Sequence, residues 1–157
     1  SAYSPVMMYT TQVLDAADID LLSQAVRSGS TDPRYDLNQD GQVNQQDRRV
    51  WVEELRYTYF GDAKLDDVFD SGDFVHTFQQ GLYEDAIAGN AGWNAGDWNG
   101  NADFESGDFV SAFQAGGYEQ GARPSSVAVP EPASVWLALS TLAWTLRRRR
   151  GSVSTEY

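Results

Sequence analysis

The apolar residues of the chain gather in short stretches separated by polar loops. Four stretches carry apolar residues at helical spacing: Ile19, Leu22 and Val26; Val50, Trp51 and Leu55; Phe74, Val75 and Phe78; and Phe109, Val110 and Phe113. This spacing predicts four amphipathic helices whose aromatic residues form the core. Gly29, Gly81 and Gly116 follow three of the stretches and predict where those helices end. We therefore expect an all-α fold.

One phrase occurs twice in the chain, as FDSGDFV at 69–75 and as FESGDFV at 104–110. Serine and glycine beside acidic residues could belong to a hydrolase nucleophile loop. A duplicated metal-binding loop is the other interpretation. His76 is the chain's only histidine, and no base is duplicated with the two serines, so the residues favour the metal loop.

Three 12-residue segments begin and end in aspartate and carry a hydrophobic residue at the eighth position. They are DLNQDGQVNQQD (Asp36–Asp47), DAKLDDVFDSGD (Asp62–Asp73) and DWNGNADFESGD (Asp97–Asp108), here called loops 1, 2 and 3. A weaker fourth copy places Leu14 at the eighth position and Asp18 at the twelfth. We expect the hydrophobic residues at the eighth positions to pair with one another between loops.

Loop 1 fits the calcium-loop pattern D-x-[DN]-x-[DN]-G. Calcium takes six to eight hard oxygen ligands, and alternate residues of such a loop supply them. The expected ligands are Asp36, Asn38, Asp40, the Gln42 carbonyl, Asn44 and Asp47. Gly41 allows the backbone a positive φ. The alternative is an Asx-rich turn that binds no ion.

Loops 2 and 3 depart from this pattern. In loop 3 the expected ligands are Asp97, Asn99, Asn101, the Asp103 carbonyl, Glu105 and Asp108, and Ala102 replaces the glycine. In loop 2 they are Asp62, Asp66, the Val68 carbonyl, Asp70 and Asp73. There Lys64 takes the third ligand place and Asp67 replaces the glycine. We expect calcium affinity to fall from loop 1 to loop 3 to loop 2, and Ser71 and Ser106 to cap the helices that follow.

The composition of the chain argues against several classes of function. The 157 residues carry a formal net charge of −12 and contain no cysteine. Nucleic acid is not an expected partner, because phosphate binding needs clustered Lys and Arg. Disulfides and thiolate metal sites are absent from this chain, and a single histidine argues against a Ser-His-Asp triad. We therefore expect no enzymatic activity.

The C-terminal part follows a polar linker and reads VPEPASVWLALSTLAWTLRRRR. Ala133–Leu146 has no charged residue. As a helix it would span about 21 Å, less than the roughly 30 Å hydrocarbon core of a bilayer. Arg147–Arg150 would stay on the cytoplasmic side by the positive-inside rule. We therefore expect this helix to insert into the membrane, and a basic amphipathic helix on the membrane surface is the alternative.

Two family resemblances follow from these motifs. Loop 1 and its following helix resemble a dockerin repeat, a secreted calcium module that binds cohesin domains and is best known on polysaccharide-degrading enzymes. The tail resembles a PEP-CTERM sorting signal, carried by Pro130, Glu131, Pro132, Arg147, Arg148, Arg149 and Arg150. That resemblance implies recognition by an exosortase-type membrane enzyme, cleavage near the PEP motif and delivery to the cell surface or extracellular matrix. The combination is similar to C-terminal regions of large secreted planctomycete proteins.

The expected organisation is an N-terminal segment (1–13), a dockerin or EF-hand-like repeat region (14–118), a linker (119–132), a hydrophobic helix with its arginines (133–150) and a tail (151–157). Ser1 is not a start methionine and the segment after it is not a signal peptide, so we expect the C-terminal part of a longer exported protein, or a trimmed chain. The expected function is a calcium-binding interaction module. The alternatives are a calcium-stabilised spacer and the non-catalytic end of an extracellular polysaccharide-active hydrolase.

Overall fold

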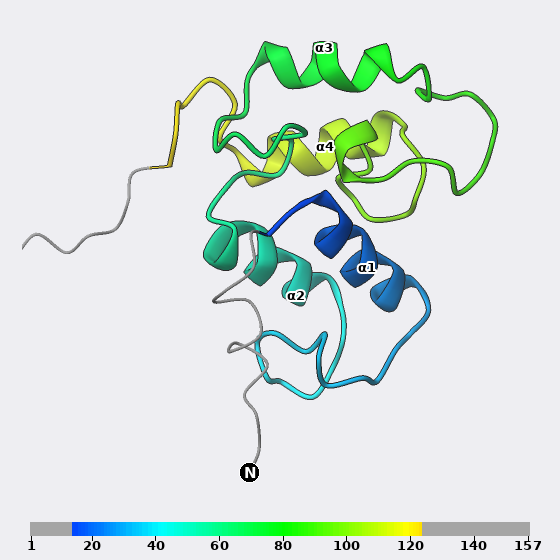
Figure 1. Cartoon of the computed structure of the whole chain (residues 1–157), viewed down its shortest axis with the longest axis vertical. Coiled ribbons are helices and arrows are strands. Elements are labelled where there is room, and N and C mark those ends of the chain that lie inside the picture. Colours follow the sequence, from blue (N-terminus) through cyan, green and yellow to red (C-terminus); the bar gives the residue numbers. More distant parts are fainter. Residues whose placement is uncertain (1–13, 124–157) are drawn as a thin grey trace, which may run out of the picture. The chain divides into compact units, whose positions relative to one another are not determined.

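The computed structural model describes residues 14–123, which lie in one structural unit of the chain (Figure 1). Its helical elements are α1 (Ala16–Arg27), α2 (Gln45–Val50), a π-helical turn η2 (Trp51–Leu55), α3 (Ser71–Gln79), a 3₁₀ turn η3 (Trp93–Ala95) and α4 (Ser106–Ala115). The described residues contain two isolated β-bridges and no strand. The expectation of a mostly helical fold is therefore confirmed for this part of the chain.

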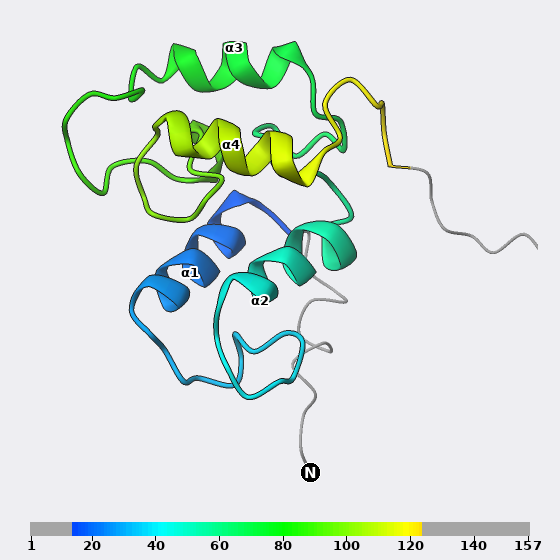
Figure 2. The ribbon, with the colours of Figure 1, turned by 180° about the vertical axis from the view of Figure 1, so that it is seen from behind.

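The helices form two pairs. Both views of the ribbon place α1 beside α2 and α3 beside α4 (Figures 1 and 2). Helices α3 and α4 run antiparallel, since Phe74 lies 5.9 Å from Phe113 and Phe78 lies 6.0 Å from Phe109, measured between ring centroids. The η3 turn contacts both α1 and α3 and so joins the two pairs.

Each helix begins at the same point of its repeat. The ninth loop residue is the N-cap, and the carboxylate of the twelfth accepts the backbone N–H of the ninth at 2.8–3.0 Å. The N-caps are Asp15, Asn44, Asp70 and Glu105. Ser71 and Ser106 were expected to be the caps, and that expectation is wrong, because each is the first residue inside its helix.

Large aromatic side chains fill the centre of the unit. Trp51, Trp93 and Trp98 are fully buried. The Trp93 indole N–H donates to the Asp62 carbonyl at 2.7 Å, and its backbone N–H donates to the Asp20 carboxylate at 2.7 Å. Trp93 therefore ties loop 2 to α1, across the two helix pairs.

The two repeats that contain α3 and α4 are joined by two equivalent β-bridges. Phe69, at the eighth position of loop 2, forms a parallel bridge with Tyr118, beyond the end of α4. Phe104, at the eighth position of loop 3, bridges Tyr83, beyond the end of α3. The expectation that the hydrophobic residues at the eighth positions pair with one another is wrong for Phe69 and Phe104, because each pairs with the tyrosine that follows the other repeat's helix.

Not every aromatic residue of the helices lies in the core. Phe74 and Phe109 face each other between the helices, with ring centroids 5.8 Å apart. Four apolar residues that were expected to be core are 48–57% exposed: Val75, Phe78, Val110 and Phe113. Since they occupy the same positions of the two repeats, the α3–α4 pair presents an apolar surface made of two equivalent halves.

The tail that carries the PEP motif, the apolar segment 133–146 and Arg147–Arg150 lies outside the described residues. Among residues 14–123, none of the helices has the length and apolar character needed to cross a bilayer.

Candidate metal-binding loops

The sixth residue of every loop has a left-handed backbone. The φ angle is 86° at Gly41, 72° at Asp67 and 74° at Ala102. The three loops therefore share one turn, although only loop 1 has the glycine that adopts it without strain. The expectation of a positive φ at Gly41 is confirmed.

The first carboxylate of each loop accepts the N–H of this sixth residue. The N···O distances are 2.9 Å from Gly41 to Asp36, 2.8 Å from Asp67 to Asp62 and 2.9 Å from Ala102 to Asp97. The same carboxylates also accept the N–H of Asp40, Asp66 and Gly100, respectively. Each loop is thus closed around its first aspartate.

The last carboxylate of each loop is fully buried and also accepts backbone N–H groups. Asp47 accepts from Leu37 at 2.7 Å, Asp73 from Lys64 at 3.3 Å and Asp108 from Asn99 at 2.8 Å. A carboxylate offers about four lone-pair sites, so these bonds leave acceptor capacity for an ion.

The first half of loop 1 keeps its expected ligand side chains at or near the surface, whereas Asp47 is buried. Asn38 and Asp40 are exposed, Asp36 is half-buried, and the Asn38 amide donates to the Asp40 carboxylate at 3.0 Å. Among residues 14–123, no Lys or Arg forms an ion pair with a carboxylate of loop 1. An all-oxygen donor set without a competing cation fits calcium.

Loop 3 is contacted by two arginines of the first helix pair. Arg27 donates to the Gly100 carbonyl at 2.9 Å and lies 3.7 Å from the Asp97 carboxylate. The buried Arg48 donates to the Trp98 carbonyl at 3.1 Å, and burial lowers its pKa to about 10. The donors of loop 3 fit calcium, but these positive charges would weaken its binding.

Loop 2 brings three carboxylates together. Single oxygens of Asp62, Asp66 and Asp73 lie within 4.8 Å of one another. The Lys64 ammonium lies beside them, 2.9 Å from Asp66 and 4.0 Å from Asp73, and 3.8 Å from the Asp70 carboxylate. Loop 2 was expected to bind calcium most weakly, yet its three carboxylates lie close to one another, with the lysine ammonium beside them.

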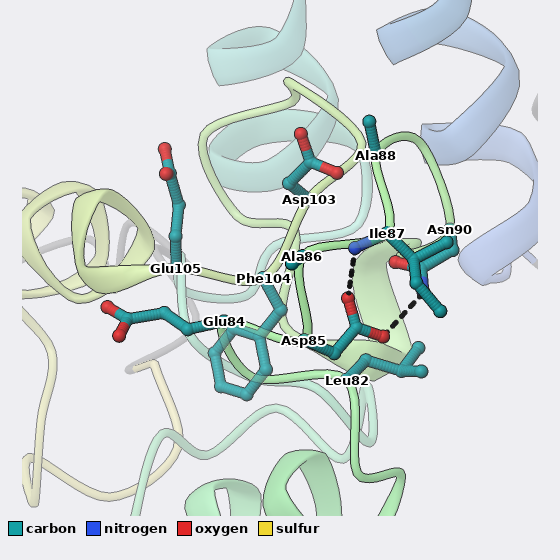
Figure 3. A pocket seen from close by; sticks show the side chains of 10 residues that line it. All are labelled: Leu82, Glu84, Asp85, Ala86, Ile87, Ala88, Asn90, Asp103, Phe104 and Glu105. Carbon is teal, nitrogen blue, oxygen red and sulfur yellow. Dashed lines mark hydrogen bonds between the residues drawn. The ribbon is translucent and has the colours of Figure 1, made fainter.

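A cavity of about 370 Å³ opens beside loop 3. Figure 3 shows Phe104 within its lining and the Asp85 carboxylate between the Ile87 amide and the Asn90 side chain, to which it is bonded at 2.8 Å each. Asp103 accepts the Gly89 N–H at 2.6 Å across the opening. The bonds of Asp85 close segment 85–90 on itself, and the bonds of Gly89 to Asp103 and of Glu84 to the Phe104 carbonyl hold the segment against loop 3.

Two features of the site escaped the sequence reasoning. The repeat is longer than the loop and its helix, since Gly61 and Gly96 precede the first aspartates and Tyr83 and Tyr118 follow the helices at equal offsets. Continuing the alignment outward from the repeated phrase would have found them. The contacts of Arg27 and Arg48 with loop 3 have no such signal, because they join separate repeats.

Comparison with known proteins gave no match to any family model, curated protein or solved structure.

The buried loop carboxylates predict a pH dependence of the metal-free protein. Burial raises the pKa of Asp62 and of Asp108 to about 6, above their ordinary value of 3.8. The folded state thus holds these protons more tightly than the unfolded state, and their stabilisation is lost as pH rises from about 4 to about 6. We expect the unfolding midpoint in chelator to fall by several °C over this range.

Differential scanning fluorimetry between pH 4 and pH 8 measures this change. Saturating calcium should reverse the part of this trend that comes from Asp108, because the ion competes with protons for the carboxylate oxygens of loop 3. A metal-free midpoint that rises steadily from pH 4 to pH 7 would contradict the assignment.

Proposed function

We propose that this chain is a calcium-binding, dockerin-like interaction module of an exported protein and that it is not an enzyme. Calcium holds the loops in the shape that positions the exit helices, and the helices contact a partner protein. A cohesin-like or other extracellular protein is the partner that the loop resemblance suggests. The observation that carries the proposal is the common backbone of the three loops, with a left-handed sixth residue and two carboxylates facing the loop's own amides.

Charge supports the calcium part of the proposal. Residues 14–123 contain 21 acidic and 7 basic side chains. Several acids of the loops are buried, including Asp47 and Asp108. Burying like charges close together is costly unless a cation or a proton compensates them. In loop 1 the buried Asp47 accepts three backbone N–H groups, and a bound cation would supply the positive charge that this loop's carboxylates otherwise lack.

The exposed apolar surface supports interaction over a simple spacer. Val75 and Phe78 on α3 and Val110 and Phe113 on α4 are about half exposed. A spacer needs no such surface, whereas apolar groups gathered on one helix pair are typical of protein–protein contacts. The surrounding acidic side chains favour a partner with an apolar centre and a basic rim.

A pull-down from extracellular proteins of the source organism tests the interaction. We expect capture in calcium and none in chelator. A Val75→Glu, Val110→Glu variant should lose at least ten-fold of the captured protein, because it places charge on the apolar surface. Leu21→Glu is the matched control, since Leu21 is also 52% exposed but lies on α1. Equal capture by all three proteins would favour the spacer.

The other two candidate roles have less support. The spacer leaves the apolar residues of α3 and α4 unexplained. A role as the non-catalytic end of a polysaccharide-active hydrolase rests on the dockerin resemblance alone. We propose from the sequence of the tail that an exosortase-type enzyme processes the protein at the membrane, and the mass of the exported protein tests this: an intact Tyr157 argues against cleavage.

A further inference from the structure

We propose that the ammonium group of Lys64 is the resident cation of loop 2, and that this loop therefore folds without calcium and does not bind it. This inference deepens the proposed function by stating which loops take metal. The carboxylates of loop 2 suit a cation, but the side chain at the third ligand place is itself positively charged.

The Lys64 ammonium lies among the carboxylates of loop 2. Lys64 Nζ lies 2.9, 3.8 and 4.0 Å from carboxylate oxygens of Asp66, Asp70 and Asp73. These residues hold the fifth, ninth and twelfth positions, which supply side-chain ligands in a calcium loop. The ammonium thus contacts the groups that an ion would contact.

Comparison with loop 3 shows that Lys64 reaches the same place as a ligand side chain. A Cβ added to Gly72, the eleventh residue of loop 2, would lie 3.0 Å from Lys64 Nζ. A Cβ added to the equivalent Gly107 would lie 3.3 Å from the Asn99 side-chain nitrogen. Lys64 and Asn99 share the third position, so the lysine brings its charge to the point where loop 3 has a neutral amide.

The remaining groups of loop 2 are also satisfied by the protein. The Asp62 carboxylate accepts the Thr58 hydroxyl in addition to the N–H groups of Asp66 and Asp67. Arg56 pairs with the Asp67 carboxylate and donates to the Leu65 carbonyl. A divalent ion would have to displace or approach these positive groups, at a Coulomb cost that grows as the site is buried.

Loop 2 can therefore act as a metal-independent anchor for α3. Lys64 contacts Asp70, the N-cap of α3, and Asp73, in its first turn. When calcium is removed, loop 1 loses its compensating charge and loop 3 keeps Arg27 beside Asp97. Loop 2 keeps Lys64 within its carboxylate cluster. The two halves of the α3–α4 pair are alike in sequence but differ in their response to metal.

A calcium titration followed by ¹⁵N NMR tests this with the wild-type protein. The reporters are the equivalent amides of Gly41, Asp67 and Ala102, each bonded to the first carboxylate of its loop. We expect calcium to shift the Gly41 and Ala102 signals and to leave Asp67 in place. A saturable shift of Asp67 in the wild-type protein would overturn the proposal.

The Lys64→Asn variant is expected to gain calcium binding at loop 2. Removing the charge and adding an oxygen should raise the calcium affinity of loop 2 at least about 100-fold and make the Asp67 amide respond. Lys64→Met removes the charge without adding a ligand and should bind less tightly than Lys64→Asn. A silent Asp67 amide in a folded Lys64→Asn protein would show that Lys64 is not what excludes the ion, and would also overturn the proposal.

The outcomes separate this inference from the proposed function. If Gly41 and Ala102 do not respond to calcium, the proposed function fails, while a new response of Asp67 in Lys64→Asn still supports the assignment of Lys64. If the variant does not fold, the wild-type titration and the protection of the Asp67 amide from hydrogen exchange in chelator decide the question. If the Asp67 amide loses its protection from hydrogen exchange in chelator together with the Gly41 amide, loop 2 does not fold independently of metal.

Discussion

If loops 1 and 3 bind calcium as proposed, we expect its removal to lower the unfolding midpoint of this protein by on the order of 10 °C for each occupied loop. Calcium at 100 times its Kd stabilises a folded protein by about 2.7 kcal/mol per site. In a domain of about this size, 1 kcal/mol corresponds to roughly 4–8 °C. With loops 1 and 3 occupied, the two contributions add. The measurement is thermal unfolding, followed by circular dichroism, in chelator and in millimolar calcium.

General screening of the acidic surface must be separated from site binding. Any salt reduces repulsion among the 21 acidic side chains of residues 14–123. Sodium chloride at matched ionic strength is therefore the first control. An Asp36→Ala variant is the second control, because it removes the first ligand of loop 1. In a calorimetric titration with calcium, this variant should lose the tighter of the binding transitions. An unfolding midpoint that is the same in chelator and in calcium would contradict the prediction that calcium stabilises the fold.

Substitution of Gly61 or Gly96 by alanine destabilises the fold by roughly 2–5 kcal/mol, which is a large part of the stability of a small domain. These glycines have φ angles of 103° and 108°. An added Cβ would lie 2.4 Å from the Phe69 ring and 2.3 Å from the Phe104 ring, respectively. Both rings are buried and belong to the reciprocal bridges, so neither can move freely.

Gly29 and Gly81 provide the matched controls for this prediction. They also have positive φ angles, 64° and 74°, but an added Cβ meets no atom within 4 Å. Alanine at these sites adds only backbone strain, about 1–2 kcal/mol. Urea unfolding measures all four variants. Equal losses at the four glycines would mean that the close ring contact contributes nothing beyond the backbone angle.

The sequence by itself determined the local elements of this protein. Apolar spacing placed the helices, and Gly29, Gly81 and Gly116 mark their ends as expected. The repeated aspartates placed three equivalent loops, because the first and twelfth carboxylates bond amides of their own loop. These features depend on contacts within a few residues, which a sequence pattern records directly. Calcium binding itself stays a prediction.

Only the tertiary structure decided how the repeats meet. Phe69 pairs with Tyr118 rather than Phe104, because each eighth residue lies against the segment that follows the other repeat's helix. Arg27 reaches the Asp97 carboxylate from α1, far away in the sequence. Lys64 looks like a defect in the loop pattern, and its position beside Asp66 and Asp73 shows a compensating cation instead. Such pairings depend on packing between distant segments and on where a long side chain ends, which neither spacing nor composition encodes.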